Sequence, residues 1–474
     1  GHKENGMKTY RVKLNGKELE INKVRVSAMP FNKVFNGTQR PVEQTEEAYF
    51  VTADITDSAV MEISVDEGFD TYEIRPLEYN LSDKRERNTV ALNIDKPMQF
   101  TFEPDGFHNA LHIFINPPSV KPNGDVIYYG KGEHTAGLIW LESGQTLYLD
   151  EGAVVYGVIY AKDASDIKIM GRGIIDSSPY RRGDDYHDGG REIYDDLIAH
   201  GVGKEPSEAG YICSNIVIYN CKNVYIEGIT LKDSMFWSLI VRNHCENIVI
   251  DNIKIIGQWR YNSDGIDICA SKNVTVKNSF VRSFDDCFVA RAPYLNDETE
   301  DVENITVENC VLWCDWGKSL EIWCGNKPCA IRNISFKNVY LIRLSFVAIN
   351  ITTWYGSEMS LVENVTYKDI YINSDSEQNR MSGMIESEEN PVYKNRKIKA
   401  KILHIKPERL GKSTGNQGLE TVDNYDNFNN CYRNIILDGI HTDEDEPIFE
   451  IGENNEYTQI YNIVVNECDF EIQR

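Results

Sequence analysis

Two short segments carry four aspartates at a spacing that suits acid–base chemistry. The first reads Tyr261-Asn-Ser-Asp-Gly-Ile-Asp267 and the second reads Phe284-Asp-Asp-Cys287. Asp264 and Asp286 lie 22 positions apart. Carboxylates held close together repel one another, which raises the pKa of at least one and leaves a proton donor beside ionised neighbours. That combination is what general acid–base catalysis requires.

Paired carboxyl groups are suited to hydrolysis of a glycosidic bond with inversion. One protonated carboxyl donates to the leaving oxygen, and a carboxylate about 6.5–9.5 Å away activates water. Segments stacked one coil apart, at about 4.8 Å plus a lateral offset, would reach this separation. The alternative is that Asp264, Asp285 and Asp286 only stack in turns. For Asp267, one strand step further along, this alternative is equally good.

A repeat predicts the stacking itself. Asn followed by alternating apolar residues recurs, mostly at intervals of 24–31 residues. The copies begin at Asn223, Asn247, Asn273, Asn304, Asn333, Asn364, Asn434 and Asn462. Units of this length made of strands predict an all-β solenoid, a right-handed parallel β-helix over residues 126–474. Each Asn is expected to bond turn backbone and to stack on its copy one coil away.

Other segments complete the predicted domain organisation. Alternating strands over residues 1–118 predict a small antiparallel β-sandwich, in which Asn15-Gly16 suits a type I′ hairpin turn. Pro and Gly residues mark a linker at 119–125. The long interval from Asn364 to Asn434 predicts an insertion at about 374–430.

The aspartate motifs resemble a known group of enzymes. Asn262-Ser-Asp264-Gly-Ile-Asp267 with Asp285-Asp286-Cys287 is similar to the signature of glycoside hydrolase family 28, the polygalacturonases, and of the related dextranase family 49. Both are families of inverting β-helix hydrolases, and the likeness covers roughly Val126 to Tyr371. The resemblance implies that Asp285 is the general acid and that Asp264 and Asp286 hold the attacking water.

The sequence also departs from the polygalacturonase pattern. Lys318 stands where the histidine of a Gly-His-Gly motif is expected. The stretch Phe346–Thr352 lacks the Arg-Ile-Lys pair that grips a galacturonate carboxylate in that family. A lysine is a poorer carboxylate fork than arginine. We therefore expect a neutral poly- or oligosaccharide, with polygalacturonase action on pectic oligosaccharides as the alternative.

Polar and aromatic residues near the aspartates are candidates for sugar binding, because sugar faces stack on flat rings and hydroxyls bond polar side chains. The substrate-binding candidates are Lys318, Glu321, Asn262, Asp267, Arg260, Trp316, Trp323 and Trp354. For the aromatic residues, packing in the solenoid is an equal alternative. The loop 180–191 is expected to form a cleft wall or to be a solvated loop.

Composition limits the partners. The net charge of −25 argues against nucleic acid and anionic membranes. The eleven cysteines form no CxxC pair, so we expect no zinc site, no other metal and no cofactor. The polar first ten residues predict a cytoplasmic protein if Met7 is the native start, and a secreted or periplasmic one if a signal peptide has been removed.

Two other classes of protein remain open. A β-helix polysaccharide lyase would use the acidic cluster to bind calcium and Lys318 as its base. A non-catalytic glycan-binding solenoid would have no need for three crowded carboxylates.

Overall fold

The computed structural model describes most of the chain. The described residues are 7–28, 40–180, 191–202, 214–291, 300–324, 329–353, 360–374, 399–407, 430–456 and 458–472. The chain divides into two compact units, Gly1–Met29 with Val42–Lys121, and Pro30–Pro41 with Pro122–Arg474.

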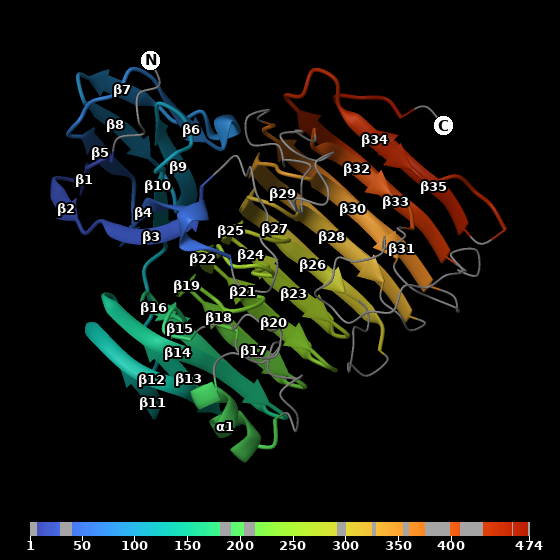
Figure 1. Cartoon of the computed structure of the whole chain (residues 1–474), viewed down its shortest axis with the longest axis horizontal. Helices are drawn as coiled ribbons and strands as arrows, with labels where there is room; N and C mark the ends of the chain where they lie inside the picture. Colours follow the sequence, from blue (N-terminus) through green and yellow to red (C-terminus); the bar gives the residue numbers. More distant parts are fainter. Residues whose placement is uncertain are drawn as a thin grey trace. The chain divides into compact units, whose positions relative to one another are not determined.

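The N-terminal unit consists of two five-stranded sheets (Figure 1). The order of the first sheet is β2 (Lys17–Leu19), β1 (Tyr10–Leu14), β5 (Ala59–Val65), β8 (Thr89–Ile94) and β7 (Asp83–Glu86). The order of the second is β3 (Asn22–Ser27), β4 (Thr45–Asp54), β10 (Leu111–Asn116), β9 (Met98–Pro104) and β6 (Tyr72–Arg75). Two short 3-10 helices, η1 (Val42–Gln44) and η2 (Leu77–Tyr79), complete the unit.

These sheets confirm the predicted sandwich with one difference. Apolar side chains of both sheets form one buried core. The hairpin of β1 and β2 turns at Asn15 and Gly16, which both have positive φ, 47° and 80°. The type I′ turn requires positive φ at both positions. However, β4 and β10 pair in parallel, so the second sheet is mixed.

The second unit is a parallel β-helix, as predicted. Its described strands form one 25-stranded sheet (Figure 1). In chain order they are β11 (Val126–Tyr129), β12 (Gly132–Leu141), β13 (Thr146–Leu149), β14 (Ala153–Lys162), β15 (Ser165–Gly171), β16 (Ile174–Asp176), β17 (Ile216–Tyr219), β18 (Lys222–Glu227), β19 (Thr230–Lys232), β20 (Leu239–Arg242), β21 (Glu246–Asp251), β22 (Lys254–Ile256), β23 (Ile266–Cys269), β24 (Lys272–Lys277), β25 (Phe280–Ser283), β26 (Phe288–Arg291), β27 (Val302–Cys314), β28 (Lys318–Cys324), β29 (Cys329–Arg343), β30 (Val347–Thr353), β31 (Ser360–Ile372), β32 (Lys401–Ile405), β33 (Asn430–Thr442), β34 (Ile448–Ile451) and β35 (Thr458–Asn466).

Each coil contributes strands to three faces. One coil, for example, runs through β24, β25 and β26, and each of these pairs in parallel with the strand one coil earlier. Inward side chains of all three faces form one continuous apolar core. The face that contains β20, β23, β26, β28, β30 and β32 is called the C face below. On its outer side the helix α1 (Arg191–Ala199) joins an apolar cluster through Ile193 and Leu197.

The repeated asparagines form a ladder. Each of the eight lies in the left-handed region, with φ between 54° and 60°. Asn304 donates to Asn273 at 3.0 Å, Asn333 to Asn304 at 3.1 Å and Asn364 to Asn333 at 3.2 Å. The predicted stacking of asparagines between coils is therefore present in the structure.

The long interval between Asn364 and Asn434 is not a single excursion. Strand β32 lies inside it and pairs with β30 and β34 on the C face. The predicted insertion 374–430 thus contains one coil strand, and its remaining residues 375–398 and 408–429 lie outside the described part of the chain.

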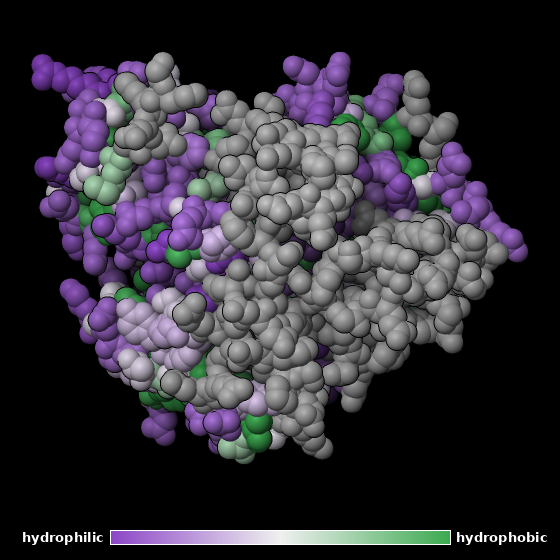
Figure 2. All heavy atoms as spheres, viewed as in Figure 1, coloured by the Kyte–Doolittle hydropathy of each residue, from purple (hydrophilic) through white to green (hydrophobic). Residues whose placement is uncertain are grey.

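No helix among the described residues is long and apolar enough to cross a membrane. The coloured surface in Figure 2 is mostly hydrophilic.

Candidate active site

Three successive loops enter the C face at the site: the first carries Asp264, the second Asp285 and Asp286, and Asp267 lies just inside β23. Backbone hydrogen bonds stack these loops, since Gly265 N donates to Asp286 O and Cys287 N donates to Lys318 O, each at 2.9 Å. The register of β23, β26 and β28 continues this stacking. Asp264, Asp286 and Lys318 therefore occupy equivalent positions in three consecutive coils.

Gly317 allows the third loop to press against the aspartates. A Cβ at this position would lie 2.6 Å from Asp286 Oδ1 and 2.7 Å from Asp285 Oδ1, closer than real carbon–oxygen contacts. The backbone of Gly317 instead donates to Phe284 O at 3.1 Å. A glycine is needed here because of the close approach and not because of its dihedral angles.

The pKa values of Asp285 and Asp286 are shifted in opposite directions from the usual value of an aspartate. Burial raises the pKa of Asp285 to about 7, helped by the charge of Asp286 and opposed by Lys318. Burial also acts on Asp286, but the charge of Lys318, a hydrogen bond with Glu321 and the Lys318 backbone N–H outweigh it and lower its pKa to about 2. Lys318 N donates to Asp286 Oδ1 at 2.8 Å. One neighbour is thus protonated near neutral pH while the other is ionised.

Asp264 and Asp267 share one cation, Arg291. Its Nη2 lies 3.6 Å from Asp264 Oδ2 and 3.5 Å from Asp267 Oδ2. The guanidinium carbon also lies 4.6 Å from the ring centres of both Trp237 and Trp323. Burial raises the pKa of both aspartates, that of Asp264 well above its usual range and that of Asp267 to about 7.

A second polar group follows on the next coils. Lys318 Nζ lies 3.3 Å from Glu321 Oε2 and 3.9 Å from Asp286 Oδ1. Asn350, one coil later on the C face, donates to Glu321 Oε1 at 3.0 Å. Burial, and then the charge of Asp286, raises the pKa of Glu321 well above its usual range. The site therefore holds five carboxyl groups and two cations among the residues described here.

Of the predicted site residues, the structure brings together Asp264, Asp267, Asp285, Asp286, Lys318 and Glu321. Trp323 joins them indirectly, through Arg291, and is only 2% exposed. Trp316 stacks on Phe284, with ring centres 5.5 Å apart and planes 9° apart. The predicted sugar-stacking role of both tryptophans stays a prediction, because both are packed inside the site.

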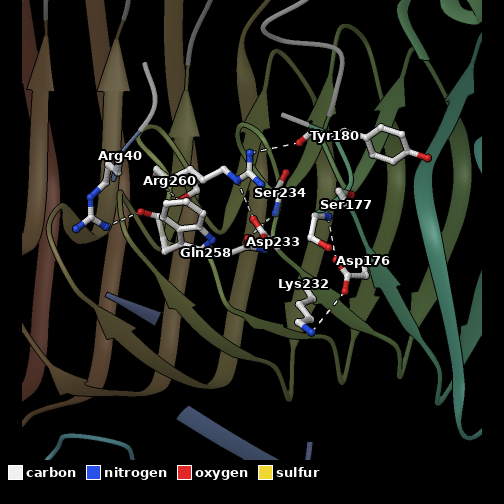
Figure 3. Close-up of polar contacts among 12 residues, drawn as sticks. Arg40, Asp176, Ser177, Tyr180, Lys232, Asp233, Ser234, Gln258 and Arg260 are labelled. Atoms are coloured by element: carbon white, nitrogen blue, oxygen red, sulfur yellow. Dashed lines mark hydrogen bonds and ion pairs between the residues drawn. The ribbon is translucent and has the colours of Figure 1, made fainter. Parts of the chain in front are cut away.

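The remaining predicted residues lie elsewhere. Arg260 is buried and donates to Asp233 Oδ1 at 2.8 Å, an ion pair visible in Figure 3. Asn262 occupies the turn before Asp264 with φ 55°, a conformation that asparagine tolerates well. Trp354 and the loop 181–190 lie outside the described residues.

Two residues of the site, Arg291 and Asn350, were missed by the motif search. Both face outwards on the C face, where they are in register with the predicted residues Trp323 and Glu321. An alignment of outward positions from coil to coil would have found them. Within the described residues, no group of three or more His, Cys, Asp or Glu side chains is arranged to hold a metal ion.

Comparisons with known proteins agree with the motifs. Residues 158–385 match the family model of glycosyl hydrolases family 28. An exopolygalacturonase of Arabidopsis thaliana is 28% identical over 170 residues, which are 30% of this chain and 39% of the relative. A probable polygalacturonase of the same plant is 26% identical over 146 residues, 26% of this chain and 32% of the relative. The aligned part is thus well under half the length of either relative.

A solved structure supports the fold over a longer range. Dex49A from Penicillium minioluteum aligns with a TM-score of 0.56 and 12% identity, covering 96% of this chain and 94% of that chain. At this identity the likeness concerns the fold alone. The family model thus confirms the resemblance to glycoside hydrolase family 28 that the aspartate motifs predict, and the match to Dex49A supports the fold.

Proposed function

We propose that the protein is an inverting glycoside hydrolase that cleaves an oligo- or polysaccharide of neutral sugars. One observation carries this proposal: the pKa values of two neighbouring aspartates are shifted in opposite directions. The pKa of Asp285 is raised to about 7 and that of Asp286 is lowered to about 2. A protonated carboxyl beside an ionised one supplies the acid and the base that inverting hydrolysis needs.

Each aspartate has a role in this mechanism. Asp285 donates its proton to the glycosidic oxygen as the bond to the leaving sugar breaks. Asp286 accepts a proton from the water that attacks the anomeric carbon from the opposite side. Asp264, in the equivalent position one coil away, orients this water together with Asp286. The proton lost by Asp285 and the proton gained by Asp286 balance over the cycle.

A neutral substrate is supported by the charges in the site. Lys318 already faces Asp286 and Glu321, and Arg291 already faces Asp264 and Asp267. A uronate carboxylate would have to compete with these groups for the two described cations. The second candidate is a polygalacturonase, and the observation that favours it is the 28% identity to an exopolygalacturonase.

The test is proton NMR of reactions with neutral α- and β-linked oligosaccharides and with oligogalacturonates. We expect the wild type to release a product of inverted anomeric configuration from a neutral member of this panel. Asp285→Asn removes the donated proton, so its kcat should fall by about 10²- to 10⁴-fold. Asp301→Asn is the control, because Asp301 is half-exposed and pairs with Arg332 on another face.

Three results would contradict the proposal. A product of retained configuration, or an Asp285→Asn variant as active as the wild type, would reject the three-aspartate mechanism. An unsaturated product that absorbs ultraviolet light would identify a lyase. Cleavage of oligogalacturonates alone would keep the mechanism and replace the neutral sugar by the second candidate.

Cellular location also stays a proposal. We propose a reducing compartment such as the cytoplasm, supported by the ten cysteines of the described residues, none of which forms a disulfide.

A further inference from the structure

Arg40 comes from a distant part of the sequence and lies against the loops of the site. The segment Pro30–Pro41 belongs to the same compact unit as the β-helix. Arg40 is 2% exposed, and its Nη1 donates to the carbonyl of Trp259, 219 residues away in sequence, at 2.5 Å (Figure 3). Its guanidinium carbon lies 4.2 Å from the ring centre of Phe284. A single side chain thus contacts two of the three loops that enter the C face.

Phe284 extends this contact to the third loop. It directly precedes Asp285, and its ring stacks on Trp316 with the ring centres 5.5 Å apart. Trp316 directly precedes Gly317, whose backbone presses against both Asp285 and Asp286. Tyr261 meets Phe284 edge-on at 5.6 Å. The Phe284 ring therefore packs between the loop that carries Asp264 and the loop that carries Gly317, next to the acid and the base.

The loop before Asp264 is already tied to the preceding coils. Gln258 donates to Asn215 Oδ1 at 3.1 Å and accepts from Ser234 N at 2.8 Å. Arg260 donates to Asp233 in the preceding coil, as Figure 3 shows. Between these two residues, the Trp259 carbonyl accepts from Arg40, which links this loop towards the following coil through Phe284.

The type of side chain matters at this place. A guanidinium can lie flat on an aromatic ring and donate hydrogen bonds in its own plane at the same time, which the ammonium group of lysine cannot do. Burial lowers the pKa of Arg40 to about 10, partly offset by Tyr261 and Asp315, so it stays charged at neutral pH. Burying a charge is costly for folding, so the contacts of Arg40 with the Trp259 carbonyl and the Phe284 ring must offset this cost.

We propose that Arg40 is a positioning residue that holds the Asp264 loop and the Asp285–Asp286 loop at the separation that hydrolysis needs. This inference rests on the proposed glycoside hydrolase function. Arg40 acts through the Trp259 carbonyl and the Phe284 ring and does not itself touch the substrate. Arg40 is then a part of the catalytic scaffold, although it precedes the whole β-helix in the sequence.

The experiment compares Arg40→Met and Arg40→Lys with Arg172→Met in the whole 474-residue chain. Arg172 is a matched control, because it is also buried and binds Glu227 at 2.8 Å, away from the aspartates. Amide hydrogen exchange is measured in residues 257–265, 283–287 and 314–318. We expect faster exchange in these three loops in Arg40→Met, a smaller change in Arg40→Lys, and no local change in Arg172→Met.

Kinetics supply the second measurement, with the oligosaccharide that the wild type cleaves. A displacement of about 1 Å in a catalytic group can reduce the rate about 10²-fold. We expect kcat of Arg40→Met to fall by about this factor with little change in KM, and Arg40→Lys to recover part of it. Arg172→Met should keep the wild-type kcat even if its unfolding temperature falls as much as that of Arg40→Met.

The outcomes separate the two proposals. Unchanged exchange in the three loops of Arg40→Met would overturn the role of Arg40, and so would an equal loss of kcat in Arg172→Met. A wild type that cleaves no member of the panel would contradict the proposed function, while hydrogen exchange would still decide whether Arg40 orders the loops. A uniform rise of exchange over the whole β-helix would show a purely structural role and reject the positioning.

Discussion

At the scale of single residues, the two neighbouring carboxyls predict the pH dependence of the reaction. Asp285 must be protonated to donate, and its pKa is about 7, so kcat/KM should fall about tenfold per unit as pH rises above 7. Asp286 must be ionised to accept, and its pKa is about 2, so activity should be lost only as pH falls towards that value. Initial rates between pH 2 and 9 test this. A fall of kcat/KM that begins already as pH rises above about 4, the usual range of an aspartate, would contradict the raised pKa of Asp285.

Lys318 sets the position of both limbs. Its positive charge lowers the pKa of Asp285 and of Asp286, so removing it raises both. We expect the acid limb and the basic limb of Lys318→Met to shift together towards higher pH. Lys318→Arg keeps the charge and should keep both limbs near their wild-type positions. A shift of either limb to lower pH would show that Lys318 is not the dominant nearby charge.

Gly317 tests how closely the third loop must approach. In Gly317→Ala the added methyl carbon meets Asp285 and Asp286 at under 3 Å, so the carboxyls or the loop must move. We expect a loss of kcat of about 10²-fold or more with a folded protein. In Gly124→Ala the methyl carbon meets nothing within 4 Å, although φ 91° strains the alanine backbone. This variant therefore controls for activity, which should be unchanged, and not for stability. An active Gly317→Ala variant would mean that the carboxyl positions tolerate displacement.

Sequence reasoning reached the aspartates because their spacing follows the coil repeat. It did not reach Arg291, because nothing local distinguishes an arginine that ends a strand. Its importance comes from two tryptophans, Trp237 and Trp323, and from two aspartates on other coils. Arg40 is beyond local patterns for the same reason, since its partners lie more than 200 residues away.

At the scale of elements, the asparagine ladder was predictable because one residue type satisfies two local needs. Its side chain bonds the copies on neighbouring coils, and its backbone adopts the left-handed conformation at little cost. The strand β32 was not predictable, because the charged segments on both sides of it mask one short apolar run. The parallel pairing of β4 and β10 was also missed, because alternation of side chains does not define strand direction.

Asn333 allows these two needs to be separated. Asn333→Ala loses two exposed side-chain hydrogen bonds, worth about 0.5 kcal/mol each. It also places alanine at φ 59°, a left-handed conformation that costs alanine about 1–2 kcal/mol. Asn333→Gly loses the same bonds and keeps the backbone conformation accessible. We expect unfolding temperatures to fall in the order wild type, Asn333→Gly, Asn333→Ala. Lys337→Ala, at an exposed position of β29, is the control. An alanine variant more stable than the glycine variant would contradict the backbone argument.

At the scale of the whole molecule, the charge of −25 predicts how salt affects the choice of substrate. Charges repel an anionic oligosaccharide over about 30 Å at 0.01 M salt and over only a few Å near 1 M. A neutral oligosaccharide does not respond to this field. We therefore expect its KM to change less than about twofold between about 0.01 M and 0.5 M salt. With oligogalacturonate, KM should be high at low salt and should fall as salt is added. The opposite response, a KM for oligogalacturonate that rises with salt, would require an attractive cationic site. It would mean that Lys318 and Arg291 bind a uronate despite their own carboxylate partners, and the proposal of a neutral sugar would have to be given up.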